Sequence, residues 1–347
     1  SIPNAWLELA PLDSGHLYLE RMANNDWRPT ASWRNLRLRA ELLRRTRAFF
    51  DDREFIEVET PLLSADTVID RHLDPLASVM PDDPRQPDRG RRFWLQTSPE
   101  FAMKRLMAAG GEAIFQITRA FRAAETGRLH NSEFTIVEWY RKGDSMTDGM
   151  DLLSELAVEL LDTRPAERIR YRDAFLLATN IDPLVSQVVD FRRTAKSHQL
   201  TVPDGFGDDR DNWLDYLMSE LVSPNLGRNR PAIVYDFPAS QAMLAKLRPE
   251  NPPVAERFEL FFRGIELANG YHELLDADEL RQRNERTNAK RVADGRMPLP
   301  AESRLLAAME SGLPSCTGLA LGFDRVVMLA AGASSLEEVV AFPIDRA

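Results

Sequence analysis

The sequence of 347 residues has very little cysteine and no long apolar run. Cys316 is the single cysteine, and no stretch approaches the ~20 apolar residues that span a bilayer. One cysteine excludes an internal disulfide framework and is typical of a reducing cytosol. The N-terminal segment also lacks a basic stretch followed by an apolar core, which is the pattern of a secretory signal. We therefore expect a cytoplasmic protein that does not associate with membranes.

Basic residues are outnumbered by acidic ones. Lysine and arginine total 44 against 54 aspartates and glutamates, so the net charge is −10. An extended RNA-binding surface normally leaves a basic footprint, and the acidic balance argues against one, although it is compatible with a local basic patch. The hydrophobic content of 44% and the charged content of 28% are those of a soluble globular protein of one large domain or two small ones.

The order of helix and strand patterns indicates the fold class. Residues 34–50 have helical periodicity, and FIEVETPLL (55–63) alternates as a strand that stops at Pro61. A later strand leads into Ser98 and Pro99, which have the residue types of a helix N-cap and first helical position. The strands are separated by long insertions without a βαβ period, which favours an α+β fold on an antiparallel sheet.

The segment FRAAETGRLHNSEFTIVEWY (121–140) predicts two strands joined by a polar loop. Strand side chains alternate, so Phe134, Glu138 and Tyr140 share one face with Ile136, and Arg122 lies close to that face. An aromatic ring, an acid, a phenol and a guanidinium suit a nucleobase, an ammonium group and a phosphate. The alternative is an ordinary amphipathic hairpin.

A second hairpin, FELFFRGIELANGYHEL (258–274), has Arg263-Gly264 as a two-residue turn. With this turn Glu259 is predicted to pair with Ala268, and Glu259 and Glu266 lie on one face, where two carboxylates could hold magnesium together with substrate phosphates. The alternative is two solvated acids. Asn269 and Glu273 follow on the same strand, and a further acid could hold a second ammonium group, which suggests a lysine-like diamino acid.

The segment GLALGFDR (318–325) places Arg325 near the start of a helix that follows a glycine-containing strand. Helix N-termini favour anions, and arginine binds phosphate oxygens with its forked guanidinium. Gly318 and Gly322 permit a close approach to the backbone. The alternative is a structural pair between Asp324 and Arg325.

FIEVETPLL, the 121–140 hairpin and GLALGFDR, in this order, resemble the three motifs of the class II aminoacyl-tRNA synthetase catalytic domain. HNSEF, EWY and the 258–274 hairpin are close to the lysyl subgroup. The resemblance implies an antiparallel sheet flanked by helices and a homodimer with the first motif at the interface. It covers residues 31–347 and implies an N-terminal extension over 1–30 and a helical insertion at about 145–230.

The resemblance also implies roles for individual residues. Arg122 and Arg325 would be catalytic and bind the α- and γ-phosphates of ATP, and Phe134 would stack on adenine. Mg2+ would be held by Glu259 and Glu266. The full ATP-binding set would be Arg122, Ala124, Glu125, His130, Asn131, Phe134, Glu266, Leu267, Gly322 and Arg325. The amino-acid set would be Ser98, Pro99, Glu100, Glu138, Tyr140, Asn269, Glu273 and Ala320.

Two departures from the family pattern refine this expectation. The second motif normally carries an acid two residues after its arginine, where this chain has Ala124, and Glu125 could substitute for that acid. Lysyl-tRNA synthetases also carry an N-terminal OB-fold that reads the anticodon, whereas only about 30 residues precede the catalytic region here, too few for such a barrel.

The chain therefore resembles the free-standing paralogues of lysyl-tRNA synthetase that attach (R)-β-lysine to a lysine side chain of elongation factor P. Ala320 stands where lysyl-tRNA synthetases have glycine, and its methyl group would change which amino acid fits. The resemblance implies an ATP-dependent ligase that uses (R)-β-lysine or lysine, with elongation factor P as acceptor and tRNA disfavoured. The alternatives are a truncated lysyl-tRNA synthetase, or another lysyl-adenylate-forming enzyme, and a non-catalytic regulatory paralogue.

Overall fold

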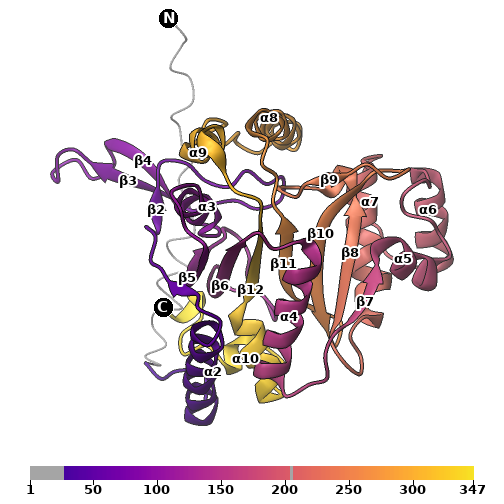
Figure 1. The fold of residues 1–347 in the computed structure, drawn as a ribbon, viewed down its shortest axis with the longest axis horizontal. Helices are drawn as coiled ribbons and strands as arrows, with labels where there is room; N and C mark the ends of the chain where they lie inside the picture. Colours follow the sequence, from indigo (N-terminus) through magenta and orange to yellow (C-terminus); the bar gives the residue numbers. More distant parts are fainter. Residues whose placement is uncertain (1–26, 204–205) are drawn as a thin grey trace, which may run out of the picture.

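The computed structural model describes residues 27–203 and 206–347, and a sheet of nine strands forms its centre (Figure 1). The order is β1-β5-β6-β12-β11-β10-β8-β7, with β9 paired to β10. The inner pairs are antiparallel, whereas the edge pairs β1–β5 and β7–β8 are parallel. The prediction of an α+β fold on an antiparallel sheet is thus confirmed. The strands are β1 (Ile56–Glu57), β5 (Ala113–Phe121), β6 (Glu133–Lys142), β7 (Glu167–Arg170), β8 (Ala232–Pro238), β9 (Leu247–Arg248), β10 (Val254–Phe262), β11 (Ile265–His272) and β12 (Cys316–Gly322).

Helices pack on both faces of the sheet, and each face has its own hydrophobic core. Phe50, Trp139 and Phe258 belong to the core beneath helices α2, α4 and α10. Tyr140 and Phe175 belong to the core on the opposite face. Trp139 and Tyr140 face different cores because side chains alternate along β6. The helices are α2 (Trp33–Asp51), α3 (Glu100–Ala108), α4 (Met146–Leu161), α5 (Tyr171–Thr179), α6 (Val188–Ser197), α7 (Arg210–Leu217), α8 (Ala277–Ala293), α9 (Arg304–Gly312) and α10 (Phe323–Ala331).

A small second sheet corrects the strand predicted over 55–63. β1 contains two residues of that segment, and after Pro61 the chain leaves the main sheet. Proline has no backbone N–H to donate to a strand ladder, so it separates β1 from the next strand. That next strand belongs to a three-stranded sheet of order β2-β4-β3, which projects from the molecule in Figure 1. Its strands are β2 (Leu63–Ser64), β3 (Ala77–Pro81) and β4 (Gly90–Leu95).

The two helix predictions have different outcomes. The helix predicted over 34–50 is confirmed as α2. The helix predicted to begin with Pro99 starts one residue later, at Glu100, and Pro99 takes the cap position without a side-chain hydrogen bond. Ser98 still contributes to the helix start, because its hydroxyl accepts a hydrogen bond from the Glu100 N–H at 3.2 Å.

The hairpin of β10 and β11 has the predicted turn but not the predicted register. Arg263 and Gly264 have φ angles of 52° and 76°, as a type I′ turn requires. A β-bulge then shifts the pairing, so Glu259 lies opposite Asn269 instead of Ala268. Leu267 is the extra residue of the bulge. Because of it, Glu266 and Asn269 both face the same side of the sheet as Glu259, although three positions separate them.

The remaining domain predictions stand as follows. The segment predicted as a helical insertion contains α4, α5, α6 and α7, but it also contributes β7 to the edge of the sheet, and its limits stay a prediction. Most of the predicted extension over 1–30 lies outside the described residues. No helix in the described ranges is long and apolar enough to cross a membrane.

Candidate active site

A cavity of about 860 Å³ opens on the face of the sheet that carries Tyr140, and strands β6, β10, β11 and β12 form its floor. It brings together predicted site residues that are up to 227 positions apart in the chain (Ser98 to Arg325). Two of the predicted site residues, Pro99 and Ala124, do not line it. The predicted residues that do line it are Ser98, Glu100, Arg122, Glu125, His130, Asn131, Phe134, Glu138, Tyr140, Glu259, Glu266, Leu267, Asn269, Glu273, Ala320, Gly322 and Arg325.

The turn after β5 presents Arg122 to the cavity. Its guanidinium lies 4.9 Å from the centre of the Phe134 ring, and one of its terminal nitrogens is 3.8 Å from the Glu125 carboxylate. The Nε of Arg122 is buried and has no hydrogen-bond partner within the described residues. Ala124 has a left-handed φ of 60°, so the chain turns there and brings Glu125 to the cavity wall. An unpaired buried guanidinium nitrogen beside an aromatic ring is suited to bind an anion attached to a planar base.

Arg325 joins the start of α10 to the loop between β5 and β6. It donates hydrogen bonds to the carbonyls of Leu129 (3.2 Å) and Glu266 (2.9 Å) and to Nε2 of His130 (2.7 Å). Burial and the charge of Arg325 lower the pKa of His130, so its imidazole is neutral and accepts that hydrogen bond. Arg325 and Arg122 thus face one cavity from two sides.

The alternative of a structural pair between Asp324 and Arg325 is wrong. Asp324 pairs instead with Arg39 from α2, at 2.6 Å, and accepts a hydrogen bond from the Thr135 N–H at 3.0 Å. Asn131 is also fully engaged, because its amide donates to the Glu133 carbonyl (2.6 Å) and accepts from the Ile344 N–H (2.9 Å). Asn131 therefore fixes the loop in this structure, and its predicted contact with a nucleotide stays a prediction.

Glu138 lies in an acidic pocket of the cavity, which it forms together with Glu100 and Glu273. It is 1% exposed and accepts hydrogen bonds from the hydroxyls of Ser98 (2.5 Å) and Tyr140 (2.7 Å). Burial, and then the negative charge of Glu100, raise the pKa of Glu138 to about 8. Burial also keeps Tyr140 protonated by raising its pKa, so its hydroxyl remains a donor. Glu138 has no cation in direct contact among the described residues, and its predicted role in binding an ammonium group stays a prediction.

Lys104 is a residue of this pocket that the sequence analysis did not identify. It is 2% exposed, and its ammonium lies 2.6 Å from Glu100 and 2.5 Å from Glu273. Burial opposes its charge, but the two carboxylates outweigh burial and raise the pKa of Lys104. The sequence holds one signal for the contact with Glu100, since the two residues are four positions apart in α3. Contrary to the prediction, Glu273 is not a member of β11 but the residue directly after it, and its contact with Lys104 has no local signal.

Strand β12 gives the acidic pocket its floor. A Cβ atom at Gly318 would lie 2.2 Å from the Tyr140 ring and 2.3 Å from a Glu273 oxygen, so this strand position requires glycine. Ala320 pairs with Glu138 on one side and Asn269 on the other, and its methyl group lines the cavity between them. A side chain at this position therefore limits the space beside Glu138.

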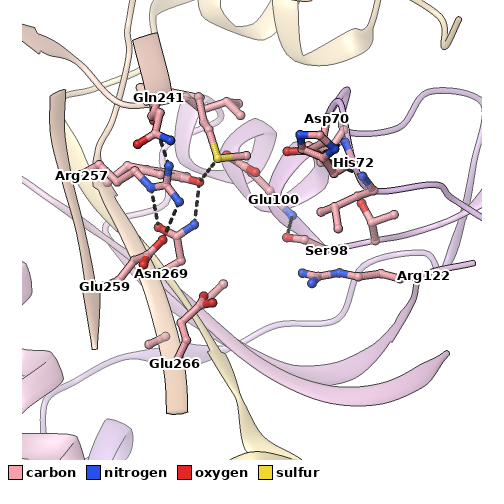
Figure 2. Close-up of a pocket in the computed structure, with 18 of the residues that line it drawn as sticks. Asp70, His72, Ser98, Glu100, Arg122, Gln241, Arg257, Glu259, Glu266 and Asn269 are labelled. Atoms are coloured by element: carbon pink, nitrogen blue, oxygen red, sulfur yellow. Dashed lines mark hydrogen bonds and ion pairs between the residues drawn. The ribbon is translucent and has the colours of Figure 1, made fainter. Parts of the chain in front are cut away.

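Glu259 is held by Arg257, another residue that the sequence analysis did not identify (Figure 2). The guanidinium is 2.5 Å from Glu259 and donates hydrogen bonds to the Gln241 carbonyl (2.9 Å) and to Asn269 (3.3 Å). Burial raises the pKa of Glu259, while Arg257 opposes that shift. Arg257 is two residues from Glu259 on one strand, so the period of two already places both on one face.

The carboxylates of Glu259 and Glu266 fit a magnesium ion in number and chemistry. Both line the cavity, and Figure 2 shows them across the cavity from Arg122. Within the described residues no group of three or more potential metal ligands occurs. A magnesium ion commonly binds through one or two carboxylates and completes its shell with substrate phosphates and water. The pair therefore suits a metal that arrives with a phosphorylated ligand.

The comparisons with known proteins agree with this arrangement. The family model "tRNA synthetases class II (D, K and N)" matches residues 19–346. The chain is 46% identical over 323 residues to proteins named elongation factor P–(R)-β-lysine ligase from Klebsiella pneumoniae and Salmonella typhi. Each alignment covers 92% of this chain and 98% of the relative. The similarity thus extends over nearly the full length of these ligases.

Proposed function

The chain belongs to the class II tRNA synthetases (D, K and N), and from this membership we propose that it is an ATP-dependent ligase for elongation factor P. It would activate (R)-β-lysine as an adenylate and transfer it to the ε-amine of a lysine on that factor. The relatives that are 46% identical carry the name of this activity. We place the reaction in the cytoplasm, in keeping with the single, buried cysteine.

One observation carries the proposal: a single cavity is lined both by Arg122 and Arg325 and by the buried carboxylates of Glu138 and Glu273. The Nε of Arg122 has no hydrogen-bond partner within the described residues. Within the same residues Glu138 has no cation in contact, and the close cation of Glu273, Lys104, is shared with Glu100. A diamino acid condensed with a nucleotide has its ammonium groups and its phosphate in this same order. The cavity supports such a ligand in one orientation.

The first step would form the adenylate. The carboxylate of (R)-β-lysine attacks the α-phosphorus of ATP, and pyrophosphate leaves. Arg122 and Arg325 would neutralise the charge on the phosphates as the bond breaks. Phe134 would stack on the adenine, as its ring position beside Arg122 allows. Magnesium, when bound by Glu259 and Glu266, would supply further positive charge at the phosphates.

The second step would transfer the amino acid. The ε-amine of the acceptor lysine attacks the adenylate carbonyl, an amide bond forms and AMP leaves. None of the protein's side chains needs to form a covalent intermediate, so positioning and electrostatics would provide the rate. The hydrogen bonds of Glu138 to Ser98 and Tyr140 would orient it toward the substrate ammonium.

We propose that the active form is a homodimer through the first family motif. Ile56, Leu62 and Leu63 lie in or beside β1 and β2 and are 65%, 39% and 37% exposed. Trp33, at the start of α2, is 70% exposed. Exposed apolar side chains of this size are typical of an interface. Sedimentation equilibrium should give twice the chain mass, and an Ile56→Glu variant should shift the protein toward the monomer.

The function is tested by offering the enzyme ATP and (R)-β-lysine or α-lysine with elongation factor P or with lysine tRNA. Intact mass spectrometry should show one added β-lysyl group on elongation factor P, and acid gels should show no charging of tRNA. Charging of tRNA without modification of the factor would support a truncated lysyl-tRNA synthetase. Failure to bind ATP in calorimetry would support a regulatory paralogue.

A further inference from the structure

The proposed transfer step, on which this inference rests, needs a group that removes a proton from the acceptor. A lysine ε-amine has a pKa of about 10.4, so only about one in a thousand is free near neutral pH. The acceptor arrives from outside the cavity, on another protein. A base that serves it must therefore lie on an exposed part of the cavity wall and not in the buried acidic pocket.

The loop of residues 70–74 carries such a group. His72 is exposed and lines the cavity together with Asp70 and Arg71. The Asp70 carboxylate accepts hydrogen bonds from the backbone N–H groups of His72 (2.7 Å) and Leu73 (3.0 Å), which fixes the backbone around the imidazole. The sequence analysis did not identify this loop, because it contains no family motif and no periodic pattern.

Helix α8 holds the loop on one side. Arg291, which is buried, donates hydrogen bonds to the carbonyls of Asp70 (2.7 Å) and Leu73 (3.1 Å) and pairs with Asp74 at 2.6 Å. Arg296 adds a hydrogen bond to the His72 carbonyl at 3.0 Å. A buried arginine with three partners in five residues leaves this loop little freedom to move. The position of His72 is thus set before any substrate binds.

The turn after β5, which contains Arg122, holds the loop of residues 70–74 on the side away from α8. The Ala123 N–H donates a hydrogen bond to the Asp74 carbonyl at 2.7 Å, which joins the loop directly to the residue after Arg122. Figure 2 shows His72 on the same wall of the cavity as Ser98 and Arg122, across from Arg257. The adenylate carbonyl would lie between the Ser98 end and the Arg122 end. His72 therefore lies beside the path that an amine must take to reach this carbonyl.

Other titratable groups near the mouth are less suited. His130 already accepts a hydrogen bond from Arg325 through its Nε2. Glu125 is 3.8 Å from Arg122. Asp70 uses one carboxylate oxygen for two backbone hydrogen bonds. These three groups already have hydrogen-bond or ion-pair partners, which they would have to give up to accept a proton from the acceptor.

We propose that His72 is a catalytic base for the attack of the acceptor lysine. The ammonium group loses its first proton to water, and the electron pair of the neutral nitrogen forms the C–N bond to the adenylate carbonyl. As this bond forms, the nitrogen becomes acidic and His72 accepts its second proton. The C–O bond to the phosphate breaks, AMP leaves with the electron pair of that bond, and the imidazolium returns its proton to water.

The charges around His72 agree with this role. His72 is exposed as a residue, but neighbouring atoms remove part of the water around its ring, and this desolvation lowers its pKa. The neighbouring charges act in both directions: Asp70 and Asp294 raise the pKa, while Arg71 and Arg296 lower it. The net shift is downward from 6.5, so the imidazole is neutral at the start of the transfer step. Because the ring is exposed, it can exchange protons with water between turnovers.

The test separates the two steps of the reaction. His72→Gln and His72→Ala should leave ATP–pyrophosphate exchange with (R)-β-lysine within about twofold of wild type, because adenylate formation needs no base. Single-turnover transfer to elongation factor P near pH 7.5 should fall by about 10² or more. This deficit should shrink as the pH approaches about 10, where hydroxide can accept the proton from the attacking nitrogen in place of the imidazole.

The matched control is His198→Gln, since His198 is an exposed histidine outside the cavity, and both rates should be those of wild type. Transfer by a His72 variant at the wild-type rate would overturn the proposal, as would a deficit that does not change with pH. An equal loss of exchange and transfer would assign His72 a structural role and overturn it too. If the wild-type enzyme modifies no elongation factor P, the proposed function itself fails, independently of His72.

Discussion

The affinity for the amino acid should depend on pH through Glu138. This carboxyl is 1% exposed and has a pKa of about 8 in the free enzyme, so at pH 7 about one molecule in ten carries the carboxylate. An ammonium group binds the carboxylate and not the neutral acid. The apparent KM for (R)-β-lysine should therefore fall by about 50-fold from pH 6 to pH 8 and level off above the pKa.

The assay is ATP–pyrophosphate exchange at saturating ATP, with KM measured at each pH. Glu138→Gln cannot ionise, so its KM should vary much less over the same range. At pH 8 its KM should exceed that of wild type by about 100-fold, since a buried ammonium loses its charged partner at a cost of about 3 kcal/mol. Glu285→Gln, an exposed acid on α8 that does not line the cavity, is the control and should behave as wild type.

The same group links pH to stability in the ligand-free protein. The pKa of Glu138 is raised from 4.5 to about 8 on folding, so the folded state binds more protons between these values than the unfolded state. The contribution of Glu138 to stability is therefore fully present below 4.5 and is lost as the pH rises through the folded pKa. Glu138→Gln should thus be more stable than wild type above about pH 8 in thermal melts without ligand. A KM that varies less than about twofold with pH, together with no gain in stability, would refute the reasoning.

Three further substitutions test the remaining contacts. Lys104→Met leaves Glu100 and Glu273 without the cation that pairs with both. In urea unfolding near pH 8 it should lower the free energy of unfolding by about 3–5 kcal/mol, and by less near pH 5, where carboxyls can protonate. An equal loss at both pH values would contradict the charge argument. Gly318→Ala places a Cβ 2.3 Å from a Glu273 oxygen and should raise the KM for the amino acid by about tenfold or more without changing the KM for ATP. An unchanged amino-acid KM would show that strand β12 shifts to make room for the added methyl group. Arg122→Ala should reduce ATP–pyrophosphate exchange by at least about 10², and near-normal exchange would exclude its phosphate role.

Local patterns in the sequence predict the elements of the cavity well. The alternation from Phe134 to Tyr140 places Glu138 on the cavity face, because a strand has a fixed period of two. Arg263-Gly264 predicts the hairpin turn, since this turn type needs positive φ at both positions. These features depend on neighbouring residues, so one sequence is enough to predict them.

Features that depend on distant residues were not predictable in the same way. The bulge at Leu267 changes the partner of Glu259 from Ala268 to Asn269, and no residue type in the hairpin requires it. The ion pair of Lys104 with Glu273 joins α3 to the residue after β11, and the two residues are far apart in the chain. Family motifs mark residues that contact the substrate, and they do not mark the side chains that hold those residues in place.

The distribution of charge explains how one cavity can treat two lysine-like groups differently. In the proposed reaction the amino-acid substrate would enter a buried pocket that holds Glu138, Glu100 and Glu273, and in the described part of the chain Lys104 is the cation that pairs with two of them. Such a pocket keeps ammonium groups charged, because loss of the proton would leave buried carboxylates without partners. The acceptor must do the opposite and become neutral before it attacks. Its reactive nitrogen therefore has to remain outside the acidic pocket, beside His72, while the bound substrate fills that pocket. An acceptor ammonium that reached Glu138 would be held there in its unreactive form, so the order of binding, amino acid before acceptor, follows from the electrostatics of the site.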